Sequence, residues 1–484
     1  MVCRSLTLLA LMFLAACGAG GSNTAPVTAP PVAVDPSIRV SSIAALTTAL
    51  STAAPGAVII LADGAYADAP IVINRRGVRV QAATPGGVTL SGRATVRIMA
   101  DSTVLSGFQF RNVNIGTDEL IVVDGNFNTI TECNIVGAVA SKYVHFDGGY
   151  HHNELSMCNI EGKPGTMNAG PSVHISTSPT VINASRVRMC TFMNSLGAGG
   201  DFGNEPIRIG LGAEQDNVSA AVIEENYFEN TGLGDSETIS VKSRGNVIRH
   251  NTQNNNPLGS FVLRTGSFNS VYGNFFLRSG GVRVKEGNHQ MIHNNYFEGA
   301  APNSSLELQN QDVNPLDTIY VYHNTFFNPG PILFGGAGAN PPRNVVVANN
   351  IFFKTSGTLL GDLNVNVTFV SNIFNGAAAL GRPSGVSEFA IVNPLLQLTG
   401  AGIYGLAAGS PAVNAASAQY AAIISNPYVT NDPSMLFDVE GKSRPLDRVQ
   451  KDIGGVELNP EPPVFRPLTR ATAGPSYLRA QFAR

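Results

Sequence analysis

Short runs in which apolar residues alternate with other residues recur along this chain. Each run leads to Asn and then to an aromatic or aliphatic residue, as in Val321-Tyr322-His323-Asn324-Thr325-Phe326. The runs stand at residues 130–135, 155–160, 223–228, 248–251, 271–276, 292–297, 321–326, 347–352 and 369–374. Their spacing is roughly 21 to 35 residues, which is the period of a solenoid that adds one coil per repeat.

The repeat predicts an all-β fold, a parallel β-helix, because each coil supplies short strands whose alternate residues point inward. Asn tolerates the left-handed backbone of a sharp corner. Its amide can also hydrogen-bond to the same position of the next coil and form a ladder. The aromatic residues after the corner are expected to stack along the core. A β-propeller is the alternative, but its repeats are longer and more regular.

The ends of the solenoid differ from its middle. Ser41 and Ser42 can cap a short helix over residues 43–50, which we expect to cover the open N-terminal end. Residues 374–457 lose the Asn-Phe rhythm and predict irregular coils and a cap. We therefore place the β-helix domain at 38–457 and a Pro-rich C-terminal tail, expected to be mobile, at 458–484.

The N-terminus predicts a processing signal. Arg4 precedes an apolar stretch at residues 6–14 that is too short for a permanent bilayer span. Leu14-Ala15-Ala16-Cys17 then matches a bacterial lipobox, so residues 1–17 read as a lipoprotein signal peptide with Cys17 as the lipidated residue. Residues 18–37 read as a flexible linker. We expect a protein of the bacterial cell envelope, lipid-anchored or, if Cys17 is incidental, secreted, with membrane contact only through this anchor.

Composition narrows the picture in two ways. It is uniform along the domain and low in charge, which fits one elongated repeat domain, and the net charge of -3 argues against a nucleic-acid partner. Cys133 and Cys158 occupy equivalent repeat positions and are expected to stack as small core residues. No cysteines show zinc-site spacing, and a disulfide is not required.

Candidate chemistry lies in the middle of the chain. Asp235 and Glu237 precede Lys242, and Arg264 follows about one coil later. Carboxylates that can hold a cation, beside an amine that can take a proton, favour metal-assisted chemistry on an anionic substrate. Each residue alone is more typical of a solvated surface. Strict alternation places Lys242 on the face opposite Glu237, so a bend or bulge must intervene if they share a site.

Several motifs follow one another in a fixed order along the chain. They are Asn204-Glu205-Pro206-Ile207-Arg208-Ile209-Gly210, Glu225-Asn226-Tyr227-Phe228, the acidic pair before Ile239-Ser240-Val241-Lys242-Ser243, Gly245-Asn246, Leu263-Arg264, Gly281-Val282-Arg283-Val284 and Asn294-Asn295-Tyr296-Phe297-Glu298-Gly299. This ordered series resembles polysaccharide lyase family six, which contains alginate lyases and chondroitinase B, and the resemblance covers most of residues 58–374.

The resemblance implies a right-handed β-helix and a Ca²⁺-assisted β-elimination on an anionic polysaccharide. By position, Lys242 matches the general base and Arg264 the general acid. The residues that match the metal ligands are Asp235, Glu237 and Asn204, with Glu205 as the alternative to Asn204. The sequence departs from the family pattern at Thr265, where histidine is common, at Asp235, where glutamate is common, and in about one extra residue between the lysine and the arginine.

Three further residues are candidates for substrate binding. Arg208 and Arg283 can hold carboxylates with two hydrogen bonds, and Lys163 resembles a family position near the cleft. Alginate is the leading substrate, and a galactosaminoglycan such as dermatan sulfate, cleaved by a chondroitin B lyase, is the second. A C-5 epimerase and a non-catalytic glycan-binding β-helix are alternatives. A glycoside hydrolase requires paired carboxylates and has no need of Lys242.

Overall fold

The structure is a computed structural model that describes residues 37–165, 170–197, 203–299, 301–309, 316–335, 340–361, 367–420, 426–428, 436–445 and 451–482. The predicted signal peptide, the lipobox with Cys17 and all of the linker except Ser37 lie outside the described residues. Within the described ranges, no helix is long and apolar enough to cross a membrane.

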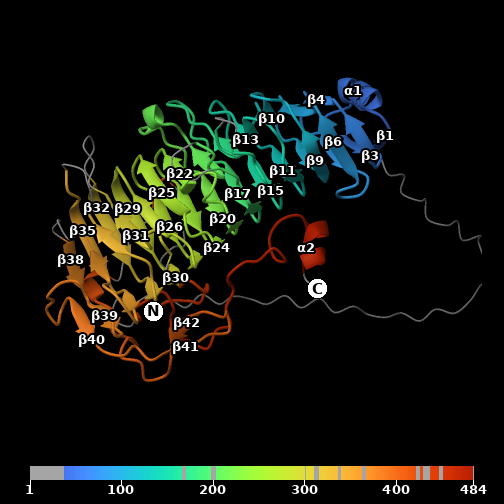
Figure 1. The fold of residues 1–484 in the computed structure, drawn as a ribbon. Coiled ribbons are helices and arrows are strands. Elements are labelled where there is room, and N and C mark those ends of the chain that lie inside the picture. The colour runs from blue at the N-terminus through green and yellow to red at the C-terminus, as the bar shows by residue number, and fades with distance from the viewer. Residues whose placement is uncertain are drawn as a thin grey trace, which may run out of the picture. The chain divides into compact units, whose positions relative to one another are not determined.

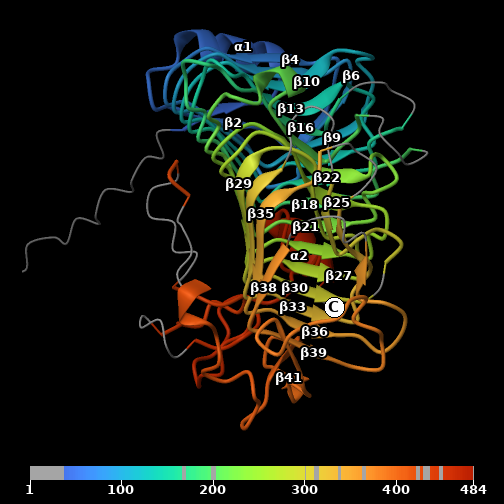
Figure 2. The ribbon, with the colours of Figure 1, turned by 90° about the vertical axis from the view of Figure 1, so that its left-hand side faces the viewer.

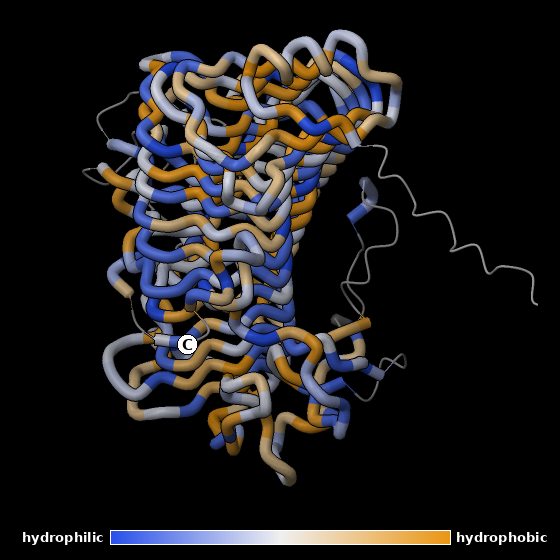
Figure 3. The backbone as a smooth tube through the Cα atoms, turned by 90° about the vertical axis from the view of Figure 1, so that its right-hand side faces the viewer, coloured by the Kyte–Doolittle hydropathy of each residue, from blue (hydrophilic) through white to orange (hydrophobic). Residues whose placement is uncertain are grey.

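The chain winds into a right-handed parallel β-helix of about 13 coils, which confirms the predicted fold. Each full coil contributes one strand to each of three parallel sheets, here called A, B and C. Figure 1 shows the strands stacked along the solenoid, and Figure 3 shows hydrophobic and hydrophilic positions alternating around the coils. The alternation read from the sequence is therefore the inward and outward alternation of these strands.

The bounds of the strands follow. Sheet A runs in the order β1 (Ile38–Val40), β2 (Val58–Leu61), β5 (Arg79–Ala82), β8 (Val104–Ser106), β11 (Thr129–Thr131), β14 (Glu154–Ser156), β17 (Arg186–Arg188), β20 (Val222–Glu224), β23 (Val247–Arg249), β26 (Ser270–Tyr272), β29 (Asn288–His293), β32 (Asp317–Tyr322), β35 (Arg343–Ala348) and β38 (Val367–Val370). Sheet B runs in the order β3 (Gly64–Ala67), β6 (Val88–Gly92), β9 (Phe108–Val113), β12 (Asn134–Val136), β15 (Asn159–Glu161), β18 (Thr191–Met193), β21 (Tyr227–Glu229), β24 (Thr252–Asn254), β27 (Phe275–Leu277), β30 (Tyr296–Glu298), β33 (Thr325–Phe327), β36 (Ile351–Phe353), β39 (Asn372–Asn375) and β40 (Phe389–Ile391). Sheet C runs in the order β4 (Pro70–Ile73), β7 (Thr95–Ile98), β10 (Glu119–Val123), β13 (Lys142–Phe146), β16 (Val173–Ile175), β19 (Ile207–Ile209), β22 (Glu237–Lys242), β25 (Ser260–Thr265), β28 (Val282–Val284), β31 (Leu306–Leu308), β34 (Ile332–Phe334) and β37 (Leu360–Gly361).

The remaining elements lie at the ends and in the turns. They are α1 (Ile43–Thr52), the 3-10 turns η1 (Gly212–Glu214) and η2 (Ala418–Tyr420), the antiparallel pair β41 (Leu396–Leu398) and β42 (Tyr404–Leu406), and α2 (Ser476–Phe482). Figure 2 shows α1 at one end of the β-helix and β41 at the other. The predicted cap is confirmed: the Ser42 side chain accepts a hydrogen bond from the amide of Ala45, and Leu46 and Leu50 are buried.

An asparagine ladder runs along the corner between sheets A and B. In each rung the backbone amide and the side-chain amide of one Asn donate to the Oδ1 of the next, as from Asn251 to Asn274, both at 3.0 Å. The same ladder links Asn226, Asn251, Asn274, Asn295, Asn324, Asn350 and Asn372. The predicted ladder is thus confirmed, and it satisfies buried backbone groups at every corner.

The predicted reason for asparagine at the corner needs a correction. The left-handed residue is most often the one before the ladder Asn, such as Glu225 (φ 56°) and His250 (φ 55°). Asparagine is required there for its amide, because only a side chain with both a donor and an acceptor can extend the ladder in both directions.

Cysteines continue the ladder where the asparagines stop. The amide of Cys133 donates to Cys158 Sγ and that of Cys158 to Cys190 Sγ, both at 3.4 Å, while the amide of Cys190 donates to Asn226 Oδ1. All three thiols are buried and free. The stacking predicted for Cys133 and Cys158 is confirmed. The Asn of these early repeats, at Asn134, lies one position later than the ladder.

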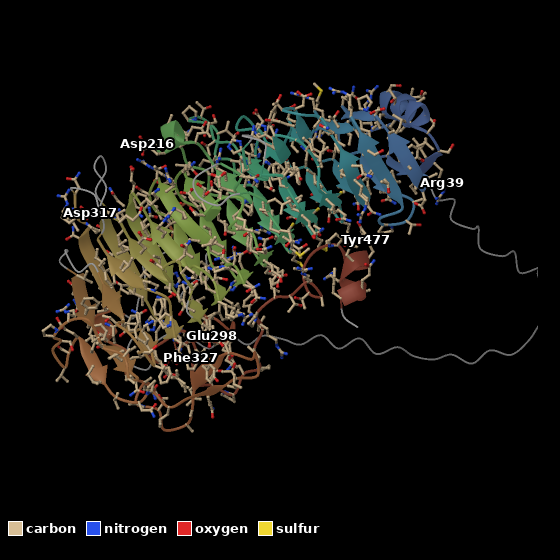
Figure 4. The ribbon with its side chains drawn as sticks, in the orientation of Figure 1. Arg39, Asp216, Glu298, Asp317, Phe327 and Tyr477 are labelled. Carbon is tan, nitrogen blue, oxygen red and sulfur yellow. The ribbon has the colours of Figure 1, made fainter. Side chains whose placement is uncertain are left out.

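The C-terminal tail lies against the solenoid, whereas the sequence predicted a mobile segment. Arg470 pairs with Glu229 at 2.7 Å, and the amide of Ser476 donates to Glu132 at 2.6 Å. Figure 4 shows Tyr477 beside the solenoid, where its ring packs on Gly86. A high proline content predicts an irregular backbone, but it does not predict the side-chain contacts that hold this tail against the solenoid.

Candidate active site

Most of the predicted site residues lie on the outer face of sheet C, on β19, β22, β25 and β28, and Figure 1 shows β22 and β25 midway along the solenoid. Asn204 and Asp235 lie in the turns just before β19 and β22, and Lys163 follows β15. The strands align Arg208 with Ser240, Ser240 with Val262 and Val262 with Arg283. The flanking residues Ile207, Ile209, Ile239 and Val241 are fully buried. The inward residues therefore anchor each strand, and the alternate residues carry polar groups outward.

The bulge that the sequence required is present in β22. Its pairing with β25 shifts register between Glu237 and Ile239 and again between Val241 and Lys242. The extra residue, Thr238, is buried, and the shift lets Glu237, Ser240 and Lys242 share the outward side. The charges of Glu237 and Arg264 both act on the pKa of Lys242, as expected for groups in one site.

Asp235 is a buried carboxylate whose hydrogen-bond donors are backbone amides. Its Oδ2 accepts from Gly203 at 2.7 Å, and its Oδ1 accepts from Glu237 at 2.8 Å. Burial and the negative charge of Glu205 raise the pKa of Asp235 to about 6. Uncompensated negative charge of this kind is what a bound cation relieves.

Glu237 is also buried, but it has cationic partners. Its Oε1 accepts from Arg264 Nη1 at 2.7 Å and from Arg283 Nη2 at 3.3 Å, and its Oε2 accepts from Ser240 at 2.5 Å. Burial alone would raise the pKa of this carboxyl, but the Ser240 hydrogen bond and the two guanidinium charges lower it. Glu237 therefore stays ionised and holds both arginines.

Glu205 links the predicted base to a predicted substrate-binding arginine. Arg208 donates Nε to Glu205 Oε1 at 2.9 Å and Nη2 to Oε2 at 2.5 Å, and Lys242 Nζ lies 3.9 Å from Oε1. Burial and the charge of Arg208 lower the pKa of Lys242, and Glu205 partly offsets them. A lowered pKa increases the neutral amine, the form that can accept a proton.

Lys163 lies beneath the site rather than on its surface. It is 1% exposed, and its ammonium donates to Asn204 Oδ1 and to the carbonyl of Gly170, both at 2.8 Å. Burial lowers its pKa to about 8. The structure brings Lys163 to the predicted metal ligand Asn204, and its direct contact with a substrate stays a prediction.

The oxygens of Asn204, Asp235 and Glu237 are carboxylate and amide oxygens, the donor set that calcium prefers. The buried charge of Asp235 beside Glu205 favours a cation there. Among the described residues, no three His, Cys, Asp or Glu side chains are already grouped as a metal site. The donors fit calcium by their chemistry, while Lys163, Arg264 and Arg283 now occupy oxygens that the ion would use.

Thr265 stands where the resemblance expects histidine. It is the strand partner of Lys242, and its buried hydroxyl has no hydrogen-bond partner. A threonine cannot shuttle a proton as imidazole does, so this side of Lys242 lacks a second titrating group.

A second polar group on sheet C was missed by the sequence analysis. His145 aligns with His174, and His174 with Arg208. The two imidazoles stack at 5.1 Å, and His145 Nδ1 lies 2.7 Å from Glu119 Oε2, whose other oxygen pairs with Lys142. In the sequence, this polar group appears only as two isolated histidines. Their positions on the outward side of neighbouring strands can be recognised only after the strands have been aligned.

This group makes a testable contribution to stability. His145 and Lys142 lower the pKa of Glu119 to about 2 against the desolvating effect of burial. Stability from Glu119 is therefore fully present above its ordinary pKa of 4.5 and is lost as pH falls toward 2. Glu119→Gln should cost roughly 1 to 3 kcal/mol at pH 7 in urea unfolding, with the difference shrinking below pH 4.5. Asp118→Asn, at the exposed neighbour, is the control, and an equal loss at every pH would contradict the assignment.

Comparison with known proteins adds family information. Residues 40–379 match the family model described as Chondroitinase B. Among solved structures, the PL6 family alginate lyase AlyGC is 24% identical with a TM-score of 0.68, covering 88% of this chain and 59% of that one. A mannuronic acid specific polysaccharide family 6 lyase from human gut microbiota is 22% identical with a TM-score of 0.60, covering 70% and 86%. A PL6 alginate lyase in complex with a trisaccharide is 17% identical with a TM-score of 0.63, covering 78% and 93%.

This chain thus spans 59% of the length of AlyGC. At these identities the structural likenesses support the fold. No curated protein matches the chain.

Proposed function

Because the chain belongs to the chondroitinase B family, the polysaccharide lyases of family 6, we propose that it cleaves a uronate-containing polyanion by β-elimination, with alginate as the leading substrate. One observation carries the proposal: the amine of Lys242 and the guanidinium groups of Arg264 and Arg283 converge with buried carboxylates on one outward face. The positive charges of Lys242, Arg264 and Arg283 on this face favour an anionic polymer as the substrate, despite the net negative charge of the protein.

The proposed reaction needs a base at C-5 of the uronate. Lys242, in its neutral form, takes the C-5 proton, so that the C–H bond breaks and the amine becomes ammonium. The electron pair forms the double bond between C-4 and C-5, and the bond from C-4 to the glycosidic oxygen breaks. Arg264 steadies the negative charge of the leaving oxygen. Because arginine remains protonated, water or the substrate supplies the proton that this oxygen finally gains.

The proposed calcium ion supplies electrostatic stabilisation of the substrate carboxylate as the C-5 proton leaves. Asp235, Glu237 and Asn204 would hold it, with Glu205 as the alternative to Asn204. Arg208 and Arg283 orient the substrate carboxylates. The second candidate substrate is dermatan sulfate, because the matching family model bears the name of chondroitinase B.

We also propose that Cys17 carries a lipid that anchors the enzyme in the bacterial cell envelope. Metabolic labelling with a fatty acid tests this: Cys17→Ser should lose the label, and an equally labelled variant would contradict the anchor.

The function is tested by incubating the protein with alginate, polymannuronate, polyguluronate and dermatan sulfate while ultraviolet absorbance is followed. An unsaturated product on a uronate polymer is expected, and a calcium chelator should lower the rate at least tenfold, with recovery on adding calcium. An altered ratio of the two uronates without new absorbance would instead indicate a C-5 epimerase. Binding without either change would indicate a non-catalytic glycan-binding protein.

A further inference from the structure

Glu237 has a hydrogen-bond donor on each of its two oxygens. Arg264 and Arg283 both use Oε1, while Ser240 uses Oε2. The carboxylate is 1% exposed, so its lone pairs face these partners rather than solvent. The side chains of Arg264 and Arg283 are 29% and 19% exposed, so solvent reaches part of each arginine but hardly reaches the carboxylate.

A divalent cation on Glu237 needs the same lone pairs. Calcium binds carboxylate oxygens at about 2.3 to 2.6 Å, inside the distance at which Arg264 now donates. A dication added at this oxygen, where two guanidinium groups already meet, also brings further like-charge repulsion. We infer that a divalent cation and the two arginines compete for Glu237, so that binding of the cation releases Arg264 and Arg283 from this carboxylate toward the outer face of sheet C.

This inference rests on the proposed calcium-assisted function and adds a coupling to it. In the cation-free protein Glu237 holds the predicted acid, Arg264, away from a substrate. Arg208 provides an internal contrast, because it pairs with Glu205 and makes no hydrogen bond to Glu237. The released arginines would then be the groups that meet the substrate.

Arginine modification by phenylglyoxal, read out by peptide mass spectrometry of the full chain, tests the release. Saturating calcium, confirmed by calorimetry, should speed modification of Arg264 and Arg283 about tenfold, since a hydrogen bond to a charged group contributes about this factor. Arg244 should not change, because it pairs with Asp216, an exposed residue in the turn after η1 (Figure 4), and not with Glu237. An unchanged or slower modification of Arg264 and Arg283 would overturn the inference, as would a failure to bind calcium.

Two variants separate this coupling from a general charge effect. In Glu237→Gln the arginines should already be reactive without calcium, and added calcium should have little further effect. Glu307→Gln, on the strand next to Arg283, should keep the full response of the wild type. Lyase product formed without the arginine response overturns the inference and leaves the proposed function intact. The response without product supports the inference and contradicts the proposed function.

Discussion

Replacing Lys242 by alanine is expected to lower the turnover of a uronate polymer by about 10² to 10⁴-fold, the usual contribution of a general base. Lys242 stands beside the carboxylate of Glu205 on the outward side of the β22 bulge, and burial together with the charge of Arg208 lowers its pKa. The variant therefore leaves the C-5 proton without its proposed acceptor. The measurement is the rate at which ultraviolet absorbance of the unsaturated product appears.

A matched control separates loss of the base from loss of a lysine. Lys354 is also partly buried with a lowered pKa, but it follows β36 on a remote coil and donates to the carbonyl of Pro329. Lys354→Ala should keep nearly full activity. Equal turnover of Lys242→Ala and Lys354→Ala would remove Lys242 from the mechanism, provided that both variants show the circular dichroism of the wild type.

Replacing Phe297 by alanine is expected to lower the free energy of unfolding by about 3 to 5 kcal/mol, the usual range for a buried aromatic ring. Phe297 is 1% exposed and stacks on Phe276 at 4.7 Å and on Phe326 at 4.4 Å. Each coil of a solenoid contacts mainly its neighbours, so a cavity here weakens two coil interfaces together. Urea unfolding followed by circular dichroism measures the loss.

The control for this variant lies on the next strand of the same sheet. Phe327 stacks on Phe353 and Tyr404, but its side chain is only partly buried on the outer side of the coil. Phe327→Ala should therefore cost clearly less than Phe297→Ala. Equal losses would show that the inner stack is not the main source of coil stability.

The fold could be predicted well from the sequence because each sequence repeat corresponds to one coil of the β-helix. The alternating apolar residues point inward, the repeated asparagines form the predicted ladder, and Ser42 caps α1 as expected. The residue with the left-handed backbone was placed one position late, because Asn is favoured both by that conformation and by the ladder. The contact of the tail through Arg470 could not be predicted from the sequence around it, because its partner, Glu229, is distant in the chain.

The site was predictable in its members and not in its contacts. The order of motifs singled out Lys242 and Glu237. Because Lys242 follows Glu237 by an odd number of residues, the two could share a face only if a bulge intervened, and the register of β22 shows that bulge. That Glu237 holds two arginines and Lys163 holds Asn204 depends on side chains from different coils, which spacing along the chain cannot report. The roles of these residues in catalysis stay predictions.

The mass of the products formed from a uronate polymer tests the central claim most directly. β-Elimination breaks the glycosidic bond without adding water, so each new non-reducing end should be lighter by one water than a hydrolysis product of the same length. We predict this lighter series with the wild type and its loss with Lys242→Ala. A series that carries the full added water, or a lighter series that persists undiminished in Lys242→Ala, would contradict the account.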